Sequence, residues 1–187
     1  MKPHIEVELR SIFDKKRHEK LKSFFQKHAT DLGEDDKDVY FFILPDKLFK
    51  VVNNISKKTA KLVLKLNKIG KGHDFEEIEI SINPKEIDKA VKLFSGLGYT
   101  EIQHSFQKRH NYIYKDVELA LKYSKVWGYH LELELLVDSK DKIRNAESKL
   151  RTIALELGVD VMTNEELAIF TKRKDEELRK KLRKEKI

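Results

Sequence analysis

The most constraining feature of this chain is a repeated pairing of glutamates with one residue between them. The pairs are Glu6 and Glu8, Glu77 and Glu79, and Glu132 and Glu134. Side chains alternate across a β-strand, so the two acids of each pair project from the same face. Apolar residues hold the intervening positions and face the other way. If these strands share one sheet, its polar face gathers six carboxylates.

The composition restricts the class of protein. The chain has 187 residues, enough for one domain with a sizeable core. Its apolar runs all fall well short of the roughly 18 residues that a membrane span needs. The sequence contains no cysteine, which excludes disulfides, thiolate metal sites and a cysteine nucleophile. With no signal-like stretch visible at the N-terminus, we expect a cytoplasmic protein with no membrane partner.

The formal net charge of +7 is concentrated at the C-terminal end. Residues 172–187 contain nine Lys/Arg and four Asp/Glu, whereas the rest of the chain is close to balanced. A basic tail can bind nucleic acid or an acidic membrane surface, but interleaved charges are also typical of a solvated helix. We therefore expect no nucleic-acid partner, and divide the chain into a domain over residues 1–170 and a basic, charged helical tail over residues 171–187.

Hydrophobic periodicity predicts the secondary structure. Alternation predicts eight strands, over residues 4–10, 40–44, 48–52, 61–67, 75–82, 102–114, 117–123 and 129–137. Helical spacing predicts amphipathic helices over residues 15–28, 84–96 and 139–157, and a capping box at Thr163 opens a last helix. The polar residues 30–38 predict a loop.

The order and spacing of these elements predict an α+β fold. Short connections favour an antiparallel sheet over a parallel one. Eight such strands can close into a tunnel-like β-barrel with the amphipathic helices packed outside. The apolar strand faces then lie under the helices, and the ionic faces point into the lumen. By alternation, Lys50, Lys61, Lys65, Gln107 and Arg109 share the lumen with the glutamate pairs.

Five ordered motifs now resemble a known family. Glu6-Val7-Glu8-Leu9-Arg10 resembles the ExExK signature that opens CYTH domains, also called triphosphate tunnel metalloenzymes. The segment from Trp127 to Glu134 is similar to the closing G-x-x-x-E-x-E segment of that family. Between them come matches to a strand lysine, a mid-chain acidic pair and an arginine strand, at Lys65, Glu77/Glu79 and Arg109. The resemblance covers roughly residues 3–170.

The resemblance implies a site as well as a fold. It implies that the chain holds Mg²⁺ or Mn²⁺ through Glu6, Glu8, Glu132 and Glu134. It implies that the phosphates of a small-molecule triphosphate contact Arg10, Lys50, Lys61, Lys65 and Arg109, and that Glu77 or Glu79 helps to place the attacking water. Physical chemistry agrees, because Mg²⁺ takes a few carboxylates together with phosphate oxygens. A homodimer is expected on the resemblance alone.

Most departures from the family pattern fall on the basic residues. Arg10 replaces the signature lysine, and Gln107 stands where the family has another lysine. The family usually has two arginines around residues 48–53, where this chain has only Lys50 as a basic residue. Lys122 occupies the place of an expected aspartate. These differences predict a complete acidic wall and a thinned basic wall.

Three functions therefore stay open. The first is a metal-dependent phosphohydrolase that acts on inorganic tripolyphosphate, thiamine triphosphate or a nucleoside triphosphate. The second is a class IV adenylyl cyclase, which converts ATP to cyclic AMP and pyrophosphate. The third is a non-catalytic module that binds polyphosphate or nucleotide. Lys61 can equally be an exposed strand residue, and the histidines, with no metal-ligand spacing, are expected at the surface or in packing.

Overall fold

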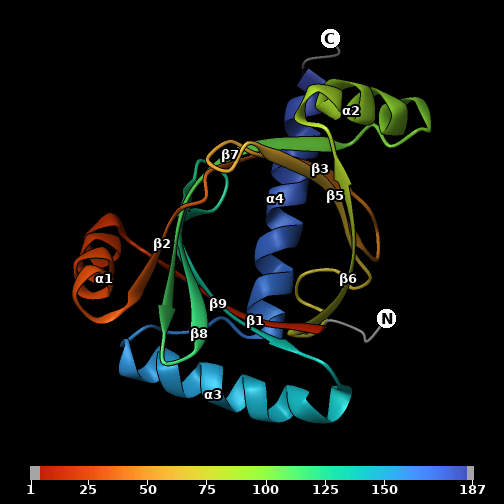
Figure 1. The fold of residues 1–187 in the computed structure, drawn as a ribbon. Helices are drawn as coiled ribbons and strands as arrows, with labels where there is room; N and C mark the ends of the chain where they lie inside the picture. Colours follow the sequence, from red (N-terminus) through yellow and green to blue (C-terminus); the bar gives the residue numbers. More distant parts are fainter. Residues whose placement is uncertain (1–4, 185–187) are drawn as a thin grey trace.

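The computed structural model describes residues 5–184, and their strands form a ring (Figure 1). The strands are β1 (Ile5–Phe13), β2 (Thr30–Glu34), β3 (Lys37–Ile43), β4 (Leu48–Asn54), β5 (Thr59–Lys65), β6 (Asp74–Ile82), β7 (Ile102–Tyr114), β8 (Val117–Ser124) and β9 (Gly128–Val137). The helices are α1 (Lys15–His28), α2 (Ile87–Gly96), α3 (Ile143–Glu156) and α4 (Asn164–Lys184), with short 3₁₀ turns at Pro84–Glu86 and Lys140–Lys142. The residues before 5 and after 184, including His4 at the expected start of the first strand, lie outside this description.

Eight of these strands close into an antiparallel barrel. They follow the order β7-β3-β4-β5-β6-β1-β9-β8, and β8 returns to pair with β7. Every pairing in the ring is antiparallel. A closed ring satisfies backbone groups that an open sheet would leave at its edges. The tunnel-like barrel expected from the sequence is therefore confirmed.

The loop expected over residues 30–38 is wrong, because β2 and the start of β3 lie there. β2 pairs with the C-terminal half of β7, with Thr30 opposite Ile113, and β3 pairs with the N-terminal half, with Lys37 opposite Gln107. β7 has 13 residues, nearly twice the length of β3, so its remaining backbone groups need a second partner. The side chains of β2 are largely exposed, and this leaves no apolar alternation to mark the strand.

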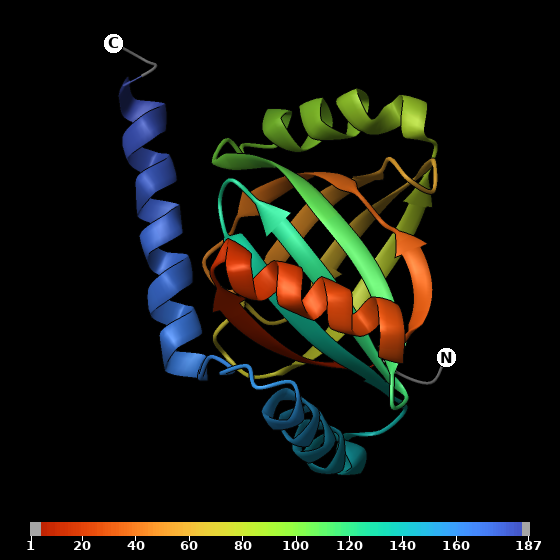
Figure 2. The ribbon, with the colours of Figure 1, turned by 90° about the vertical axis from the view of Figure 1, so that its left-hand side faces the viewer.

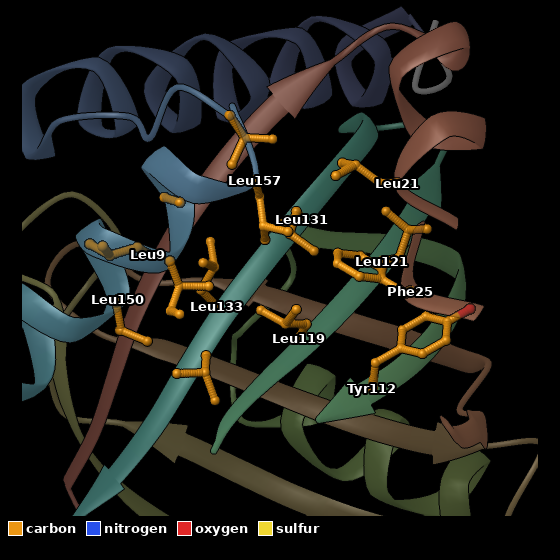
Figure 3. Close-up of a cluster of buried hydrophobic side chains, with 14 of the residues drawn as sticks. Leu9, Leu21, Phe25, Tyr112, Leu119, Leu121, Leu131, Leu133, Leu150 and Leu157 are labelled. Atoms are coloured by element: carbon orange, nitrogen blue, oxygen red, sulfur yellow. The ribbon is translucent and has the colours of Figure 1, made fainter. Parts of the chain in front are cut away.

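The main core lies outside the barrel, between its wall and two helices. β1, β8 and β9 turn leucines and valines outward, where α1 and α3 cover them (Figure 3). Fully buried residues in this layer include Leu9, Leu131 and Leu133 from the sheet, Phe25 from α1 and Leu150 from α3. Burying one such side chain contributes roughly 1.5–3 kcal/mol, so this layer fixes β1 and β9 firmly. Their alternate residues are thereby held facing the lumen.

A smaller core lies under α2, and part of the sheet has no cover. α2 packs Ile87 and Phe94 against Phe42 and Val51 on the outer faces of β3 and β4. On β6 the expectation of apolar residues under helices is wrong, since Ile78 and Ile80 are 49% and 55% exposed. Alternation fixes which face of a strand is apolar, but it does not determine whether a helix lies over it.

Helix α4 stands across one end of the barrel (Figures 1 and 2). It begins with a capping box, in which the Thr163 amide donates to the Glu166 carboxylate at 2.8 Å. It then runs unbroken through residues 170 and 171, where the sequence suggested a division between domain and tail. Among the helices of residues 5–184, none is long and apolar enough to cross a membrane.

Three contacts hold α4 at this end. The Phe170 ring packs against Trp127 with centroids 4.9 Å apart. Asp175 accepts from the Lys68 ammonium at 2.9 Å. Beyond them, the Arg179 guanidinium binds Glu101, just before β7, at 2.9 Å. The helix is therefore anchored to the rim at several points along its length.

A glycine substitution tests how closely α4 is seated. Gly70 has φ +90°, and a Cβ there would lie 2.6 Å from the Ala168 backbone nitrogen of α4. Gly33 has a similar φ of +85° and nothing within 4 Å of the same position. We expect Gly33→Ala to cost about 1–2 kcal/mol of backbone strain and Gly70→Ala to cost more, with release of α4. Thermal unfolding and limited trypsin digestion of α4 measure both effects. Equal losses in the two variants, with α4 equally protected, would contradict this packing.

Candidate functional site in the barrel lumen

A cavity of about 460 Å³ occupies the lumen, a size suited to a small-molecule ligand. Each of the eight barrel strands contributes to its lining, and so does α4. Every site residue expected from the sequence faces this cavity: Glu6, Glu8, Arg10, Lys50, Lys61, Lys65, Glu77, Glu79, Arg109, Glu132 and Glu134. The structure thus brings these residues together, although their individual roles stay predictions.

Lys65 is the centre of one ion-pair cluster. Its ammonium lies 2.9 Å from Glu6, 3.1 Å from Glu8 and 2.7 Å from Glu77. Burial disfavours a charged lysine, but these carboxylates outweigh it and raise the pKa of Lys65 well above its usual value. The Lys65 ammonium also lies 4.4 Å from the centroid of the Phe75 ring. Lys65 is therefore a permanent cation that links β1 to β6 through the lumen.

Glu132 is the centre of a second cluster. Its two oxygens lie 3.1 Å from Arg10 Nε and 2.9 Å from Lys122 Nζ, and Arg109 stands 3.7 Å away. Burial would raise the pKa of this carboxyl, but the three cations hold it well below its usual range. Arg10 also pairs with Glu8, so the two clusters are joined. Glu132 is thus an ionised acid that is already fully engaged.

A third cluster, missed at the sequence level, surrounds Asp35 at the far end of the tunnel. Asp35 accepts from Lys37 at 2.8 Å, from Lys57 at 3.1 Å and from Asn54 at 2.6 Å, and Arg109 lies 3.2 Å away. Burial opposes its ionisation, but these donors lower the pKa of Asp35. The acid lies between β2 and β3, in the segment read as a loop, where no alternation marked it.

The basic wall is consequently fuller than the sequence indicated. Lys37, Lys57 and Lys122 face the cavity in addition to the expected cations. Lys122 could have been found, because it alternates with Glu118 and Ala120 along β8. Lys37 and Lys57 could not, since they lie in stretches that look like loop and turn. The expectation of a thinned basic wall is therefore corrected by cations supplied from other positions.

Three carboxylates crowd together on the other side of the lumen, and we call Glu6, Glu8 and Glu134 the acidic corner. Glu8 stands directly opposite Glu134 in the pairing of β1 with β9. Arg109 Nη2 lies 4.0 Å from the Glu134 carboxylate. Burial raises the pKa of Glu134 to about 8, and the neighbouring Glu6 and Glu8 charges add to the effect. The carboxylates of this corner therefore repel one another, and the cations beside them are shared with Glu77 and Glu132.

The acidic corner is not a preformed metal centre. Within residues 5–184, no three His, Cys, Asp or Glu side chains are already arranged to hold a metal ion. Glu6 and Glu8 are instead turned toward Lys65, and Glu8 also toward Arg10. A cation entering the corner would therefore compete with these ion pairs.

Lys50, in contrast to the acidic corner, is a cation without a paired carboxylate among the described residues. It faces the lumen from β4, and it has no ion pair or hydrogen bond with the residues of the described chain. Burial lowers the pKa of Lys50 to about 8, and the Lys65 charge adds to this shift. A mostly protonated lysine without an anion is suited to receive one. Lys61, by contrast, pairs with Glu79 near solvent, with both side chains over a third exposed.

Part of the lumen is apolar, which differs from the expected ionic face. Val39, Val52 and Val63, from β3, β4 and β5, pack together with Phe41 on the inner side of the wall. Val52 lies on the strand where the family usually has two arginines. The lumen is therefore mainly ionic, with an apolar patch between the lysines that β3, β4 and β5 also turn inward.

His130, one of the histidines expected at the surface or in packing, is buried near Trp127 and also lines the cavity. Its Nδ1 lies 3.0 Å from the Gly128 carbonyl. Burial lowers the pKa of His130 to about 4, and the Lys122 ammonium contributes. It is therefore neutral at physiological pH. The spacing shared with Glu132 and Glu134 on β9 was the signal that could have placed it in the lumen.

A closed barrel with a charged lumen is the architecture expected from the sequence resemblance, and comparison with known proteins identifies the family. The family model of the CYTH domain matches residues 4–167, so the chain belongs to the CYTH domain family. No curated protein matches the chain significantly. The solved structures with the same fold include the PH1819 protein of Pyrococcus horikoshii, at 24% identity and a TM-score of 0.68, covering 88% of this chain and 98% of that one.

Two further structures carry functional descriptions. A Vibrio parahaemolyticus protein described as a "putative adenylate cyclase" has 15% identity and a TM-score of 0.64, covering 84% of this chain and 91% of that one. The Hippeastrum protein HpAC1, described as having a dominant triphosphatase activity, has 16% identity and a TM-score of 0.60, covering 84% and 89%. At sequence identities this low, the structural similarity establishes the fold alone.

The two inward lysines of β5 provide a matched test of the ion-pair cluster. Lys65→Met leaves three carboxylates without their shared cation, which should cost about 3–5 kcal/mol of unfolding free energy at pH 7. Lys61→Met removes a solvent-exposed pair and should cost under about 1 kcal/mol.

The Lys65→Met loss should shrink as the pH falls toward 5. In the folded variant the buried carboxylates take up protons at a higher pH than in the unfolded chain, which removes the unpaired charge. Urea unfolding of both variants at pH 7 and pH 5 gives the comparison. A Lys65→Met loss as small as that of Lys61→Met, or one that does not change with pH, would argue against a buried cluster.

Proposed function

We propose that this protein is a metal-dependent phosphohydrolase that cleaves a triphosphate inside the barrel. The proposal rests on two groups of opposite charge that lack full partners in the lumen, the acidic corner and Lys50. An acidic corner of mutually repelling carboxylates stands in the same cavity as Lys50, a half-buried cation that pairs with no carboxylate of residues 5–184. A divalent metal bound to a triphosphate would satisfy both at once. CYTH membership and the description of HpAC1 support this reading.

The acidic corner fits a hard divalent cation such as Mg²⁺ or Mn²⁺ by its chemistry. Carboxylate oxygens are the ligands these ions take. Burial and the neighbouring Glu6 and Glu8 charges raise the pKa of Glu134, and a bound cation would favour its ionised form. We assign the metal to Glu6, Glu8 and Glu134, whereas Glu132 mainly anchors Arg10, Lys122 and Arg109. When bound, the metal supplies Lewis-acid polarisation of a phosphoryl oxygen.

The chain's own cations would bind and orient the phosphates. Lys50 is ready to accept an anion, and Arg10, Lys65 and Arg109 line the same cavity. Phosphate oxygens in the lumen would compete with the carboxylates for these cations, and the carboxylates released in this way would be available to hold the metal. Phosphoryl transfer needs mainly positioning and charge neutralisation, which such a lining provides.

Glu77 is the better of the two expected water-placing acids. It is half-buried, its oxygen lies 2.7 Å from Lys65, and its pKa is lowered: burial opposes this shift, but a hydrogen bond with Glu6 and the nearby Lys65 charge outweigh it. An ionised acceptor in this position can hold a water molecule by hydrogen bonding. Glu79 is exposed and already paired with Lys61, so we give it a supporting role at the entrance.

Activity with tripolyphosphate tests the proposal. Purified protein should release phosphate from tripolyphosphate with Mg²⁺ or Mn²⁺ and not with EDTA. Glu134→Gln should lower kcat/KM at least about 100-fold, because it removes a carboxylate that would hold the metal. Glu76→Gln is the matched control, since Glu76 is exposed on the outer face of β6. Equal activity in the two variants would contradict the assignment.

The same assay separates the alternatives. With ATP, a class IV adenylyl cyclase gives cyclic AMP and pyrophosphate, whereas the hydrolase gives phosphate. Tight triphosphate binding with no product from any triphosphate would instead indicate a non-catalytic binding module, a reading that the mutually paired lumenal charges favour. The cytoplasmic location and the homodimer stay predictions.

The pH dependence of binding tests the role of Lys50. Because its pKa is about 8, the dissociation constant for tripolyphosphate should rise about tenfold between pH 7 and pH 9.5, as Lys50 loses its proton. Lys50→Arg keeps its charge over this range, so its binding should stay nearly constant.

Lys37→Gln is the control for that measurement. Burial lowers the pKa of Lys37 to about 8 as well, but Lys37 is already paired with Asp35. This variant should keep the decline of the wild type. If Lys37→Gln abolished the decline and Lys50→Arg did not, the phosphate-binding role of Lys50 would be wrong. Isothermal titration calorimetry gives the dissociation constants.

A further inference from the structure

The connection between β2 and β3 fills a gap in the pairing of the barrel wall at Arg109. β3 pairs with β7 up to residue 107, and β2 pairs with it from residue 110 onward. In the gap, the Asp35 amide donates to the Arg109 carbonyl at 2.8 Å, and the Asp36 carboxylate accepts from the Arg109 amide at 2.9 Å. Two adjacent aspartates therefore satisfy the backbone of Arg109 where no strand does so.

Asp35 also holds the side chain of Arg109. Asp35 is 3% exposed, and its carboxylate lies 3.2 Å from Arg109 Nε. The Asn111 side-chain oxygen accepts from the same Nε at 2.6 Å, and the Asn111 amide donates to Asp35 at 3.3 Å. The three side chains thus form a closed set of contacts, which fixes the Nε edge of the guanidinium.

The opposite edge of the guanidinium is held loosely. The Arg109 Nη atoms lie 3.5 Å from Glu118, 3.7 Å from Glu132 and 4.0 Å from Glu134, longer than typical charge-assisted hydrogen bonds. Because a guanidinium is a rigid planar fork, fixing its Nε edge determines where its Nη groups point. They point toward Glu132 and Glu134, on the side of the lumen where the proposed function places the metal and the phosphates.

Asp35 does not cancel the charge of Arg109, because two lysines share its carboxylate. Lys37 lies 2.8 Å from one oxygen, and Lys57 lies 3.1 Å from the other. Three cations therefore surround one buried acid. Arg109 can be held by Asp35 and still offer positive charge to an anion in the lumen.

We propose that Asp35 is a positioning residue for Arg109, which holds the guanidinium so that its Nη edge meets the phosphates in the lumen. This inference rests on the proposed function and adds a residue to its site. Asp35 acts through Arg109 and does not itself contact the triphosphate.

Positioning and simple electrostatics have opposite consequences for binding. Removing the negative charge of Asp35 would by itself strengthen the binding of an anion in the same cavity. Loss of the contact that orients Arg109 would weaken that binding. The direction of the change in affinity therefore distinguishes the two roles.

The experiment measures binding without turnover. The probe is imidotriphosphate with Mg²⁺, and isothermal titration calorimetry gives the dissociation constant. Asp35→Asn should weaken binding about tenfold, and Arg109→Gln at least about 30-fold. The double variant should bind no more weakly than Arg109→Gln alone, because Asp35 then has no guanidinium to position.

Asp31→Asn is the matched control. Asp31 also contacts a side chain of β7, His110 at 2.6 Å, but it is 54% exposed and neither residue lines the cavity. This variant should change the dissociation constant less than about twofold in either background.

Asp35→Glu provides a second test that keeps the negative charge beside Lys37 and Lys57. It displaces the carboxylate from the Arg109 Nε, so it should also weaken binding, and it should have no further effect in the Arg109→Gln background. If Asp35→Asn does not fold, Asp35→Glu carries the same comparison. Circular dichroism and thermal unfolding show which variants are folded.

The outcomes separate this inference from the proposed function. Tighter binding by Asp35→Asn, or losses that add in the double variant, would overturn the positioning role and leave the hydrolase in place. Coupled losses without phosphate release from tripolyphosphate would overturn the hydrolase and leave the positioning role. Failure of the wild type to bind imidotriphosphate would overturn both.

Discussion

The structure depends on charge neutralisation inside a closed barrel. Closing eight strands buries the inner side chains, and each buried unpaired charge would cost several kcal/mol. The chain meets this constraint with shared partners. Lys65 forms ion pairs with three carboxylates, and Glu132 forms ion pairs with three cations. Because these pairs connect β1, β5, β6, β7, β8 and β9, they also fix which strand faces point inward.

The remaining imbalances give the site its chemistry. The carboxylates of the acidic corner repel one another, and Lys50 pairs with no carboxylate in the described part of the chain. A metal ion and a triphosphate together would supply what each lacks, and the internal pairs would rearrange around them. The same pairs that stabilise the barrel therefore keep its ligands available for exchange. The apolar patch formed by Val39, Val52, Val63 and Phe41 adds a second kind of surface to the same cavity.

The sequence determined the parts of this account that follow from alternation. Glu6, Glu8, Lys65 and the β9 acids could be placed in the lumen because one face of each strand is apolar. Asp35 could not be, since its importance comes from tertiary contacts made by a polar segment. The uncovered Ile78 and Ile80, and the position of α4, depend on how helices pack, which alternation does not encode.

The central claim is that a metal and a triphosphate replace internal ion pairs in the lumen. A crystal structure with Mn²⁺ and a non-hydrolysable triphosphate measures this directly through the anomalous signal of manganese. The account predicts a manganese peak at the acidic corner, phosphate oxygens within hydrogen-bonding distance of Lys50, and Lys65 separated from at least one of its carboxylates. Manganese and phosphate bound on the outer surface, with the lumenal ion pairs unchanged, would contradict it.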